Sequence, residues 1–432
     1  MIPARTVIIG LGQTGLSCVH YCMRRGVRPV VMDTRTAPPG AEQLPEGLEC
    51  HFGGLNAGVL LNAELIIASP GVPLATPGLQ QAAGAGVEII GDVELFLREC
   101  RAPVIAITGS NGKSTVTTLV GEMAAEAGLA VGVGGNIGTP ALELLKEPLN
   151  LAVLELSSFQ LETTPGLNAL AATVLNISED HLDRYDSLAH YRDTKLGIYH
   201  GAGLCVYNRE DGETLPPAGS RAVSFGLNEQ DYGRVEHQGE RWLAVHGEPV
   251  LPVRELRIVG AHNQLNALAA MALADEAGIS RTAQLAVLRR FGGLAHRCQF
   301  IAEKQGVRWI NDSKATNVGA TLAAIDGIAD GLTGRLWLIA GGQGKGQDFG
   351  PLVPLLSTRI AGMACLGQDR AQLLELGDNT HEVADMSEAV SWCAQQAQPG
   401  DWVLLAPACA SLDMYSSYLV RGDHFATLVE AL

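Results

Sequence analysis

One stretch in the first third of the chain has the residue types and spacing of a nucleotide phosphate site. It reads Ile107-Thr108-Gly109-Ser110-Asn111-Gly112-Lys113-Ser114-Thr115, follows an apolar run and precedes a helical pattern. A strand, a glycine turn and a helix that begins at Lys-Ser form a cradle whose backbone N–H groups face phosphate oxygens. Lys113 would reach the β- and γ-phosphates, and the Ser114 or Thr115 hydroxyl would hold Mg²⁺.

The match to the usual phosphate-loop pattern is incomplete. The pattern G-x-x-x-x-G-K-[ST] requires glycine at position 107, where this chain has Ile107. The alternative is an ordinary strand-to-helix turn that contains a chance Lys-Ser pair. We favour the phosphate cradle because the flanking strand and helix are the context that the motif needs.

A second glycine motif lies at the start of the chain. Residues 10–15 fit G-x-G-x-x-G after the strand-like run 7–9, and a later strand-like run, 30–32, ends in Asp33. This is the spacing of a βαβ dinucleotide fingerprint, so the motif alone leaves an NAD-dependent dehydrogenase open. A further turn, residues 69–73, follows a strand where open α/β sheets bind ligands.

Two ionisable residues, Glu155 and His181, lie at the ends of apolar strands in the unit that bears the phosphate loop. A carboxylate such as Glu155 suits Mg²⁺, and a neutral His181 imidazole would complete a second metal site. On position alone, however, His181 is better interpreted as a capping or packed histidine. Lys195, taken in isolation, has the features of a solvated surface lysine.

The last third of the chain has three polar clusters at predicted strand ends. We expect Lys314, Thr316, Lys345 and Ser411 to meet at one edge of a sheet. Two positive charges and two hydroxyls suit an acidic small molecule. Helix capping accounts for some of these hydroxyls, but it does not explain lysines in two separate loops.

Composition limits the classes of protein that fit. The chain has 432 residues, 47% of them hydrophobic and 18% charged, a formal net charge of −16 and nine cysteines, an odd number. An acidic chain is a poor nucleic-acid binder, the apolar runs are too short for a membrane span, and the thiols suggest a reducing compartment. We therefore expect a cytoplasmic protein that binds no nucleic acid and does not insert into membranes.

The alternation of strand-like and helical patterns predicts an α/β fold with three domains. We expect a Rossmann-like N-terminal domain at 1–91, a central P-loop-type ATPase domain at 92–296 and a C-terminal Rossmann-like domain at 297–432.

Together these motifs resemble the Mur ligase family, the ATP-dependent amide ligases of peptidoglycan precursor synthesis. The resemblance covers essentially the whole chain and rests on residues 108–115, 134–138, 155–160, 262–266, 296–297 and 311–317. The ATP loop is shared with folylpolyglutamate synthetases, whereas 312–317 and 408–413 look specific to the D-glutamate-adding branch. One departure is Tyr418, which stands where the family pattern has a phenylalanine.

The resemblance implies ATP and Mg²⁺ as cofactors, and UDP-N-acetylmuramoyl-L-alanine and D-glutamate as substrates of a monomeric enzyme. The implied ATP contacts are Gly109, Asn111, Gly112, Lys113, Ser114, Thr115, Asn263, Asn266, Arg297 and Asp312. The implied UDP-substrate contacts are Gly12, Thr14, Asp33, Thr34, Arg35, Gly71, Asn136 and Ser157. The implied D-glutamate contacts are Lys314, Thr316, Lys345, Ser411, Leu412 and Tyr418.

The resemblance also implies a catalytic set and a metal set. The catalytic residues would be Lys113, Glu155, His181 and Lys195, and the metal ligands Ser114, Glu155, His181 and Lys195 in its carbamylated form. A substrate carboxylate would attack the γ-phosphate, and an amine would then attack the acyl phosphate. The alternatives are an NAD-dependent dehydrogenase, another Mur or folylpolyglutamate-type ligase, and a nucleotide-gated binding protein without chemistry.

Overall fold

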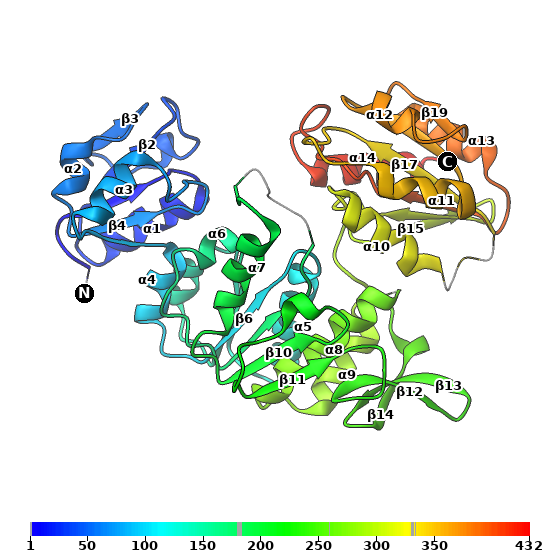
Figure 1. Ribbon diagram of the computed structural model, residues 1–432, viewed down its shortest axis with the longest axis horizontal. Helices are drawn as coiled ribbons and strands as arrows, with labels where there is room; N and C mark the ends of the chain where they lie inside the picture. Colours follow the sequence, from blue (N-terminus) through cyan, green and yellow to red (C-terminus); the bar gives the residue numbers. More distant parts are fainter. Residues whose placement is uncertain (1, 179–183, 259, 330–331, 333) are drawn as a thin grey trace. The chain divides into compact units, whose positions relative to one another are not determined.

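The computed structural model describes residues 2–178, 184–258, 260–329, 332 and 334–432 (Figure 1). The chain divides into two compact units. The first comprises Met1–His237, Trp242–Val250 and Ala267–Val287; the second comprises Gln238–Arg241, Leu251–Asn266 and Leu288–Leu432. The strands form three separate sheets, and the fold is α/β as predicted. The boundaries proposed for three domains stay predictions.

The first sheet has five parallel strands in the order β3-β2-β1-β4-β5 (Figure 1, blue). Its strands are β1 (Thr6–Ile9), β2 (Val30–Asp33), β3 (Cys50–Phe52), β4 (Leu65–Ala68) and β5 (Glu88–Ile90), and its helices are α1 (Gln13–Arg24), α2 (Ala57–Leu61) and α3 (Pro77–Gly84). β1 and β4 are buried along their whole length, as apolar strands covered on both faces must be.

The strand order of this sheet reverses between β1 and β4. The loops that follow these two strands are therefore adjacent at the carboxyl edge, the place where open α/β sheets bind ligands. The Ser69 backbone N–H donates to the Ile9 carbonyl at 2.8 Å, and its hydroxyl donates to the Gly10 carbonyl at 2.7 Å. The G-x-G-x-x-G turn and the 69–73 turn are thus joined by hydrogen bonds.

The second sheet has nine strands in the order β14-β13-β12-β11-β10-β9-β6-β8-β7. They are β6 (Val104–Thr108), β7 (Val131–Gly135), β8 (Leu151–Glu155), β9 (Ala171–Val174), β10 (Leu204–Asn208), β11 (Ala222–Phe225), β12 (Tyr232–His237), β13 (Glu240–Val245) and β14 (Glu248–Pro252). The helices of this region are α4 (Asp92–Glu99), α5 (Lys113–Glu126), α6 (Ser158–Leu161), α7 (Leu188–Leu196), α8 (Ala261–Glu276) and α9 (Arg281–Arg290).

The strands from β7 to β11 run parallel to their neighbours, with β6 between β8 and β9. The phosphate loop follows β6, so it opens at the carboxyl edge together with the ends of β8 and β9. This shared edge is what brings residues from distant parts of the sequence to one place.

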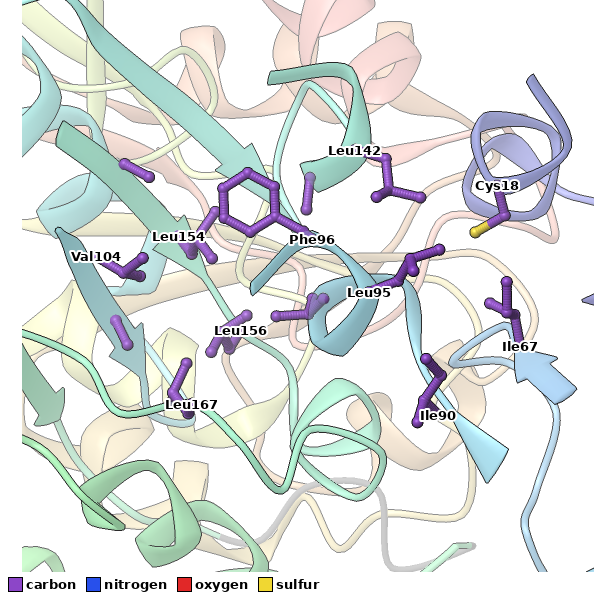
Figure 2. Close-up of a cluster of buried hydrophobic side chains, with 14 of the residues drawn as sticks. Cys18, Ile67, Ile90, Leu95, Phe96, Val104, Leu142, Leu154, Leu156 and Leu167 are labelled. Carbon is purple, nitrogen blue, oxygen red and sulfur yellow. The ribbon is translucent and has the colours of Figure 1, made fainter. Parts of the chain in front are cut away.

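The first and second sheets share one hydrophobic core, which is built around α4. Figure 2 shows Leu95 and Phe96 of this helix among Cys18 and Ile67 from the first sheet's layer and Leu142 from the second. All five are almost fully buried. Truncating a buried Leu or Phe to Ala typically costs about 2–5 kcal/mol. This core accounts for the union of the two sheets in one compact unit.

The third sheet belongs to the second unit and has the strand order β15-β16-β20-β17-β18-β19 (Figure 1, yellow to red). Its strands are β15 (Gln299–Lys304), β16 (Val307–Asn311), β17 (Leu336–Gly341), β18 (Ile360–Leu366), β19 (Thr380–Glu382) and β20 (Trp402–Leu405), and its helices are α10 (Val318–Ile328), α11 (Val353–Thr358), α12 (Arg370–Leu374), α13 (Met386–Gln396) and α14 (Tyr418–Glu430). β15 pairs antiparallel with β16, and the other strands are parallel. Apolar runs at 307–310, 335–340, 363–366 and 402–405 indicate β16, β17, β18 and β20, whereas β15 and β19 lie outside these runs.

Within the part of the chain that the structure describes, no helix combines the length and the apolar character that crossing a membrane requires.

A buried carboxyl lies at the start of α4, in the shared core. Asp92 is 2% exposed, and its burial outweighs the Asp92 and Val93 N–H groups and the Gln160 side chain, which act in the opposite direction on its pKa. Burial raises the pKa of this carboxyl to about 6, because the charged form loses its hydration. A folded-state pKa above the unfolded one means that ionisation of Asp92 opposes folding as the pH rises from about 4 through about 6.

We predict that Asp92→Asn raises the melting temperature at pH 8 more than at pH 4.5, since the amide removes a charge that the fold disfavours. The shift of the pKa to about 6 corresponds to on the order of 2–3 kcal/mol at pH 8. Thermal melts at both pH values measure it. Asp186→Asn is the matched control, because the Asp186 side chain is fully exposed. A larger destabilisation by Asp92→Asn at pH 8 than at pH 4.5 would contradict the prediction.

Candidate active site

The phosphate loop depends on two glycines with positive φ. Gly109 has φ +148° and Gly112 has φ +83°, and a Cβ built on Gly109 would lie 3.0 Å from the Leu175 Cβ. A side chain at either position would strain the backbone. The glycines therefore let the chain turn from β6 into α5 with its N–H groups at the helix start, which is the geometry of an anion cradle.

The segment after β9 fixes the shape of this loop. The Asn176 side chain accepts from the Asn111 N–H at 2.8 Å and donates to the Asn111 carbonyl at 3.1 Å. The Ser110 hydroxyl accepts from the Ser178 N–H at 2.9 Å and donates to the Ser178 carbonyl at 3.1 Å. Sequence reasoning assigned no role to Asn176. Its one signal was a polar residue just after a buried strand, beside other strand-end polar residues.

Two lysines converge on a single carbonyl of the loop. The Lys113 ammonium donates to the Gly109 carbonyl at 2.7 Å and to the Ser110 carbonyl at 2.9 Å. The Lys195 ammonium donates to the same Gly109 carbonyl at 3.1 Å and lies 4.7 Å from the centre of the Tyr191 ring. Lys195 is only 1% exposed. The interpretation of Lys195 as a solvated surface lysine is therefore wrong, because α7 packs it against the loop.

Glu155 ends β8, next to the strand that leads into the loop. It pairs with Ile107 across the sheet and is 3% exposed. Its Oε1 accepts from the Asn136 side chain at 2.7 Å, whereas its buried Oε2 has no hydrogen-bond partner among the described residues. A buried carboxylate oxygen that has no donor among the described residues fits the oxygen ligands that Mg²⁺ prefers, and Ser114, at the start of α5, offers a buried hydroxyl.

The remaining predicted metal ligand, His181, lies outside the described residues, in the range 179–183. In the described part of the chain, no group of three or more His, Cys, Asp or Glu side chains gathers as a metal site would require. Besides Glu155 and His181, the predicted metal ligands are the Ser114 hydroxyl and the Lys195 amine, which are not among these four side-chain types.

Asn136 and Ser157 lie on either side of Glu155. The Asn136 backbone N–H also donates to the Glu155 carbonyl at 2.8 Å, so both ends of Asn136 are tied to that residue. Ser157 caps α6 in a capping box with Gln160, in which each side chain bonds the backbone N–H of the other. Asn136 follows β7 and Ser157 follows β8, so the two predicted substrate contacts lie at neighbouring strand ends, beside the candidate metal ligand.

At the first sheet, Asp33 accepts four hydrogen bonds. They come from the Leu11 N–H, the Arg35 N–H and two guanidinium nitrogens of Arg35, at 2.7 to 2.9 Å. The Arg35 bonds, with help from the Leu11 N–H, lower the pKa of Asp33 to about 2 although burial opposes this. Four bonds use the acceptor capacity of a carboxylate. Asp33 therefore orients the Arg35 guanidinium beside the glycine turn.

The other predicted contacts of this sheet surround the same turn. Gly12 precedes α1 as its N-cap, and Thr14 lies in the first turn of that helix. Thr34 is exposed next to Asp33, and Gly71 is exposed in the turn after β4. A Cβ on Gly15 would lie 1.9 Å from the Gly10 carbonyl oxygen, so the glycine spacing serves close packing of α1 on β1.

The second unit contains a cavity of about 290 Å³ whose lining includes Asn263 and Arg297. Asn266, one turn along α8, donates from its side chain to the Asn263 side-chain oxygen at 3.2 Å. Cys298 also lines the cavity, and its thiol donates to an Asp312 oxygen at 3.4 Å. Burial raises the pKa of Asp312 to about 6. The four residues predicted to contact adenosine are thus connected around one cavity.

The third sheet brings three strand-end loops together, because β20 lies between β16 and β17. Gln343 and Ala410 exchange two backbone hydrogen bonds at 3.0 and 2.9 Å, which join the Lys345 loop to the Ser411 loop. The Lys314 ammonium lies 4.3 Å from the centre of the Tyr418 ring. The order β16-β20-β17 therefore places the three loops at one edge of the sheet, as the sequence predicts.

The exposures of these residues differ. Ser411 is buried, Lys314, Thr316 and Tyr418 are half-buried, and Lys345 and Leu412 are exposed. Lys345 has φ +54°, a conformation uncommon for a residue with a side chain.

Sequence reasoning missed Arg421, a buried residue of α14. Its guanidinium donates to the Ser313 hydroxyl at 3.0 Å and to the Ser313 and Cys409 carbonyls at 2.8 and 3.1 Å. Burial lowers the pKa of Arg421 to about 10. It ties the loop after β16 to the loop after β20. An isolated arginine in a helical pattern gave no signal of this role.

Sequence profiles of three families match successive parts of the chain. They are "Mur ligase MurD-like, N-terminal domain" over residues 4–91, "Mur ligase middle domain" over 107–274 and "Mur ligase, glutamate ligase domain" over 296–409. The chain belongs to the Mur ligase family.

Relatives of this Mur ligase are similar over nearly their full length. A protein of Pectobacterium atrosepticum named UDP-N-acetylmuramoylalanine--D-glutamate ligase is 56% identical over 432 residues, which cover 99% of this chain and 98% of that protein. A protein of Escherichia coli strain K12 with the same name is 55% identical over 430 residues, with the same coverage.

Solved structures of other members share the fold of this Mur ligase. A pseudomurein peptide ligase type C of Methanothermus fervidus has a TM-score of 0.64 at 19% identity and covers 99% of both chains. The UDP-N-acetylmuramate-alanine ligase of Thermotoga maritima has a TM-score of 0.62 at 20% identity, again over 99% of both chains.

We predict that Lys113→Ala leaves the fold intact and lowers the rate of phosphoryl transfer by about two to three orders of magnitude, because one charge contact to the transition state is lost. Circular dichroism and single-turnover phosphate release would measure the two effects. Lys146→Ala is the control, since Lys146 is an exposed lysine paired with Glu143. Turnover near the wild-type rate in the folded Lys113→Ala variant would show that Lys113 does not serve the phosphates.

Proposed function

We propose that this Mur ligase joins D-glutamate to UDP-N-acetylmuramoyl-L-alanine at the expense of ATP, in the synthesis of peptidoglycan precursors. The observation that carries the proposal is the 56% identity, over nearly the whole chain, to a protein with that name. The phosphate loop, with two lysine ammoniums and a buried carboxylate at one sheet edge, supports it independently.

The chemistry follows from the poor reactivity of a free carboxylate, whose leaving group would be oxide. The L-alanyl carboxylate attacks the γ-phosphate of ATP, and the D-glutamate amine attacks the acyl phosphate. The tetrahedral intermediate collapses to an amide and inorganic phosphate. Lys113 neutralises charge on the transferring group, and Gly109, Asn111, Gly112 and Thr115 hold the phosphates.

Ser114, Glu155, His181 and carbamylated Lys195 would hold Mg²⁺, which supplies further neutralisation of phosphate charge when bound. Addition of CO₂ to the Lys195 amine turns a cation into a carboxylate-like ligand. Two observations support this set: Lys195 is buried beside Gly109, and one Glu155 oxygen accepts no hydrogen bond from any residue that the structure describes.

The first sheet would bind the uridine diphosphate through Gly12, Thr14, Asp33, Thr34, Arg35 and Gly71, while Asn136 and Ser157 contact the rest of that substrate. Asp33 could serve a ribose in a ligase or in a dehydrogenase, so this glycine motif alone does not separate the two. A dehydrogenase, however, would leave the phosphate loop after β6 unexplained. The ligase accounts for both glycine motifs.

The second unit would bind adenosine and the amino acid. Asn263 and Asn266 would face adenine, and Arg297 and Asp312 the ribose and phosphates. Lys314, Thr316, Lys345 and Ser411 would hold D-glutamate, with Leu412 and Tyr418 beside it. We further propose that residues 1–91, 92–296 and 297–432 act as substrate, ATP and D-glutamate domains of a cytoplasmic monomer.

The deciding experiment measures phosphate release by the full chain with ATP, Mg²⁺ and UDP-N-acetylmuramoyl-L-alanine, with and without D-glutamate. We predict steady release only when D-glutamate is present, together with an amide product one glutamyl residue heavier by mass spectrometry. Release that ignores D-glutamate, or a product built on another amino acid, would replace this proposal by another ligase of the family. ATP binding without any product would favour a nucleotide-gated binding protein.

We predict that Lys345→Ala raises the KM for D-glutamate more than the KM for ATP, and that D-glutamine is a poor substrate. A site that holds an acid with lysines leaves those charges unpaired when the acid is replaced by an amide. Initial rates with each compound varied in turn measure the effect. Lys304→Ala is the control, because Lys304 donates to the Glu430 carbonyl at the far end of the chain. Equal use of D-glutamine and D-glutamate would rule out this amino-acid site.

A further inference from the structure

One arginine joins the first sheet's ligand turn to the second sheet. The Arg184 guanidinium donates from Nη1 to the Pro70 carbonyl at 3.2 Å and from Nη2 to the Glu162 carboxylate at 2.9 Å. Its Cζ lies 4.4 Å from the centre of the Phe159 ring. The side chain is only 13% exposed. A planar guanidinium that donates from two nitrogens and has an aromatic ring against one face has a fixed orientation.

The far end of this link is itself anchored. Glu162 follows α6, and its other oxygen accepts from the Tyr185 hydroxyl at 2.6 Å. Tyr185 is 4% exposed and stacks on Phe159. The N-cap of α6 is Ser157, two residues beyond Glu155. The chain of contacts therefore runs from the 69–73 turn to the strand end that carries the candidate metal ligand.

The 69–73 turn, which Arg184 contacts through Pro70, keeps its conformation through hydrogen bonds of its own. The 69–73 turn is held to β1 by the two hydrogen bonds of Ser69, and the Val72 N–H donates to the Ser69 carbonyl at 2.9 Å. These bonds do not involve Arg184. Loss of the arginine should therefore leave the turn folded and free to bind uridine diphosphate, while its position relative to α6 is no longer fixed.

We propose that Arg184 is a positioning residue that sets the separation between the uridine-diphosphate turn and the phosphate loop. This inference rests on the proposed function, in which one substrate is bound at both places. The UDP part of this substrate would bind at the first sheet, and the substrate carboxylate must reach the γ-phosphate of ATP at the second sheet. If the separation of the two places is fixed, binding of the UDP part also aligns the carboxylate with the γ-phosphate. Such alignment supplies much of the rate acceleration in reactions between two bound groups.

The test uses Arg184→Met in the full chain, since methionine keeps an unbranched apolar stem but has no fork. We expect kcat/KM for UDP-N-acetylmuramoyl-L-alanine to fall by about 100-fold, the size of effect that follows from a misplacement near 1 Å. The Kd of UDP alone and the Kd of ATP alone should each stay within about twofold of wild type, because each end of the site is intact. Arg184→Lys should recover part of the loss, as an ammonium makes one of the two contacts at a time.

Arg192→Met is the matched control. Arg192 lies on α7, pairs with Asp193 and Glu213, and should leave all three quantities unchanged. If Arg184→Met does not fold, Glu162→Gln weakens the same link at its anchored end and should give the same pattern at a smaller size, about tenfold.

Three results with folded Arg184→Met would overturn the inference. The first is an unchanged kcat/KM for the UDP-linked substrate. The second is a loss of UDP affinity that parallels the loss of kcat/KM, which would make Arg184 a direct ligand contact, and the third is a loss of ATP affinity. Absence of product with wild-type protein in the same assay would instead be a failure of the proposed function, which the wild-type arm reports separately.

Discussion

The carbonyl of Gly109 is the point on which the candidate reaction centre depends. It accepts from two ammonium groups, Lys113 of α5 and Lys195 of α7, and it does so in a backbone conformation that a side chain would strain. Two ammonium groups beside one carbonyl place positive charge at the turn between β6 and α5. Positive charge at the start of a helix suits an anionic ligand such as a polyphosphate.

The same edge also shows how a parallel sheet assembles a site from distant sequence. Glu155 ends β8, the loop follows β6, and Asn176 follows β9, so three neighbouring strands contribute. Their side chains interact with backbone atoms of the loop as much as with one another. The contacts of Asn176 with both backbone groups of Asn111 fix the shape of the loop before a ligand arrives, which is the kind of preorganisation that lowers a reaction barrier.

Much of the fold and many candidate residues were accessible from sequence, because glycine motifs and buried parallel strands have strong local patterns. The order of strands then explains why Lys314, Lys345 and Ser411 belong to adjacent loops. The failures were residues whose role is set by tertiary contact. Lys195 looked like a surface lysine because nothing in its helix indicates that the side chain is buried against Gly109. Asn176, Arg184 and Arg421 act through backbone carbonyls and N–H groups of remote segments, and such partners leave no trace in spacing. β15 and β19 were missed because they are edge strands with few buried residues.

The core that α4 shares between the first two sheets has a consequence for ligand design. Because Leu95 and Phe96 pack against side chains from both sheets, the uridine turn and the phosphate loop belong to one compact body. A single synthetic molecule could therefore occupy two places within one compact unit. Its two halves would act at a high effective concentration set only by the linker between them. A stiff linker of matched length should therefore convert two weak fragments into one tight inhibitor.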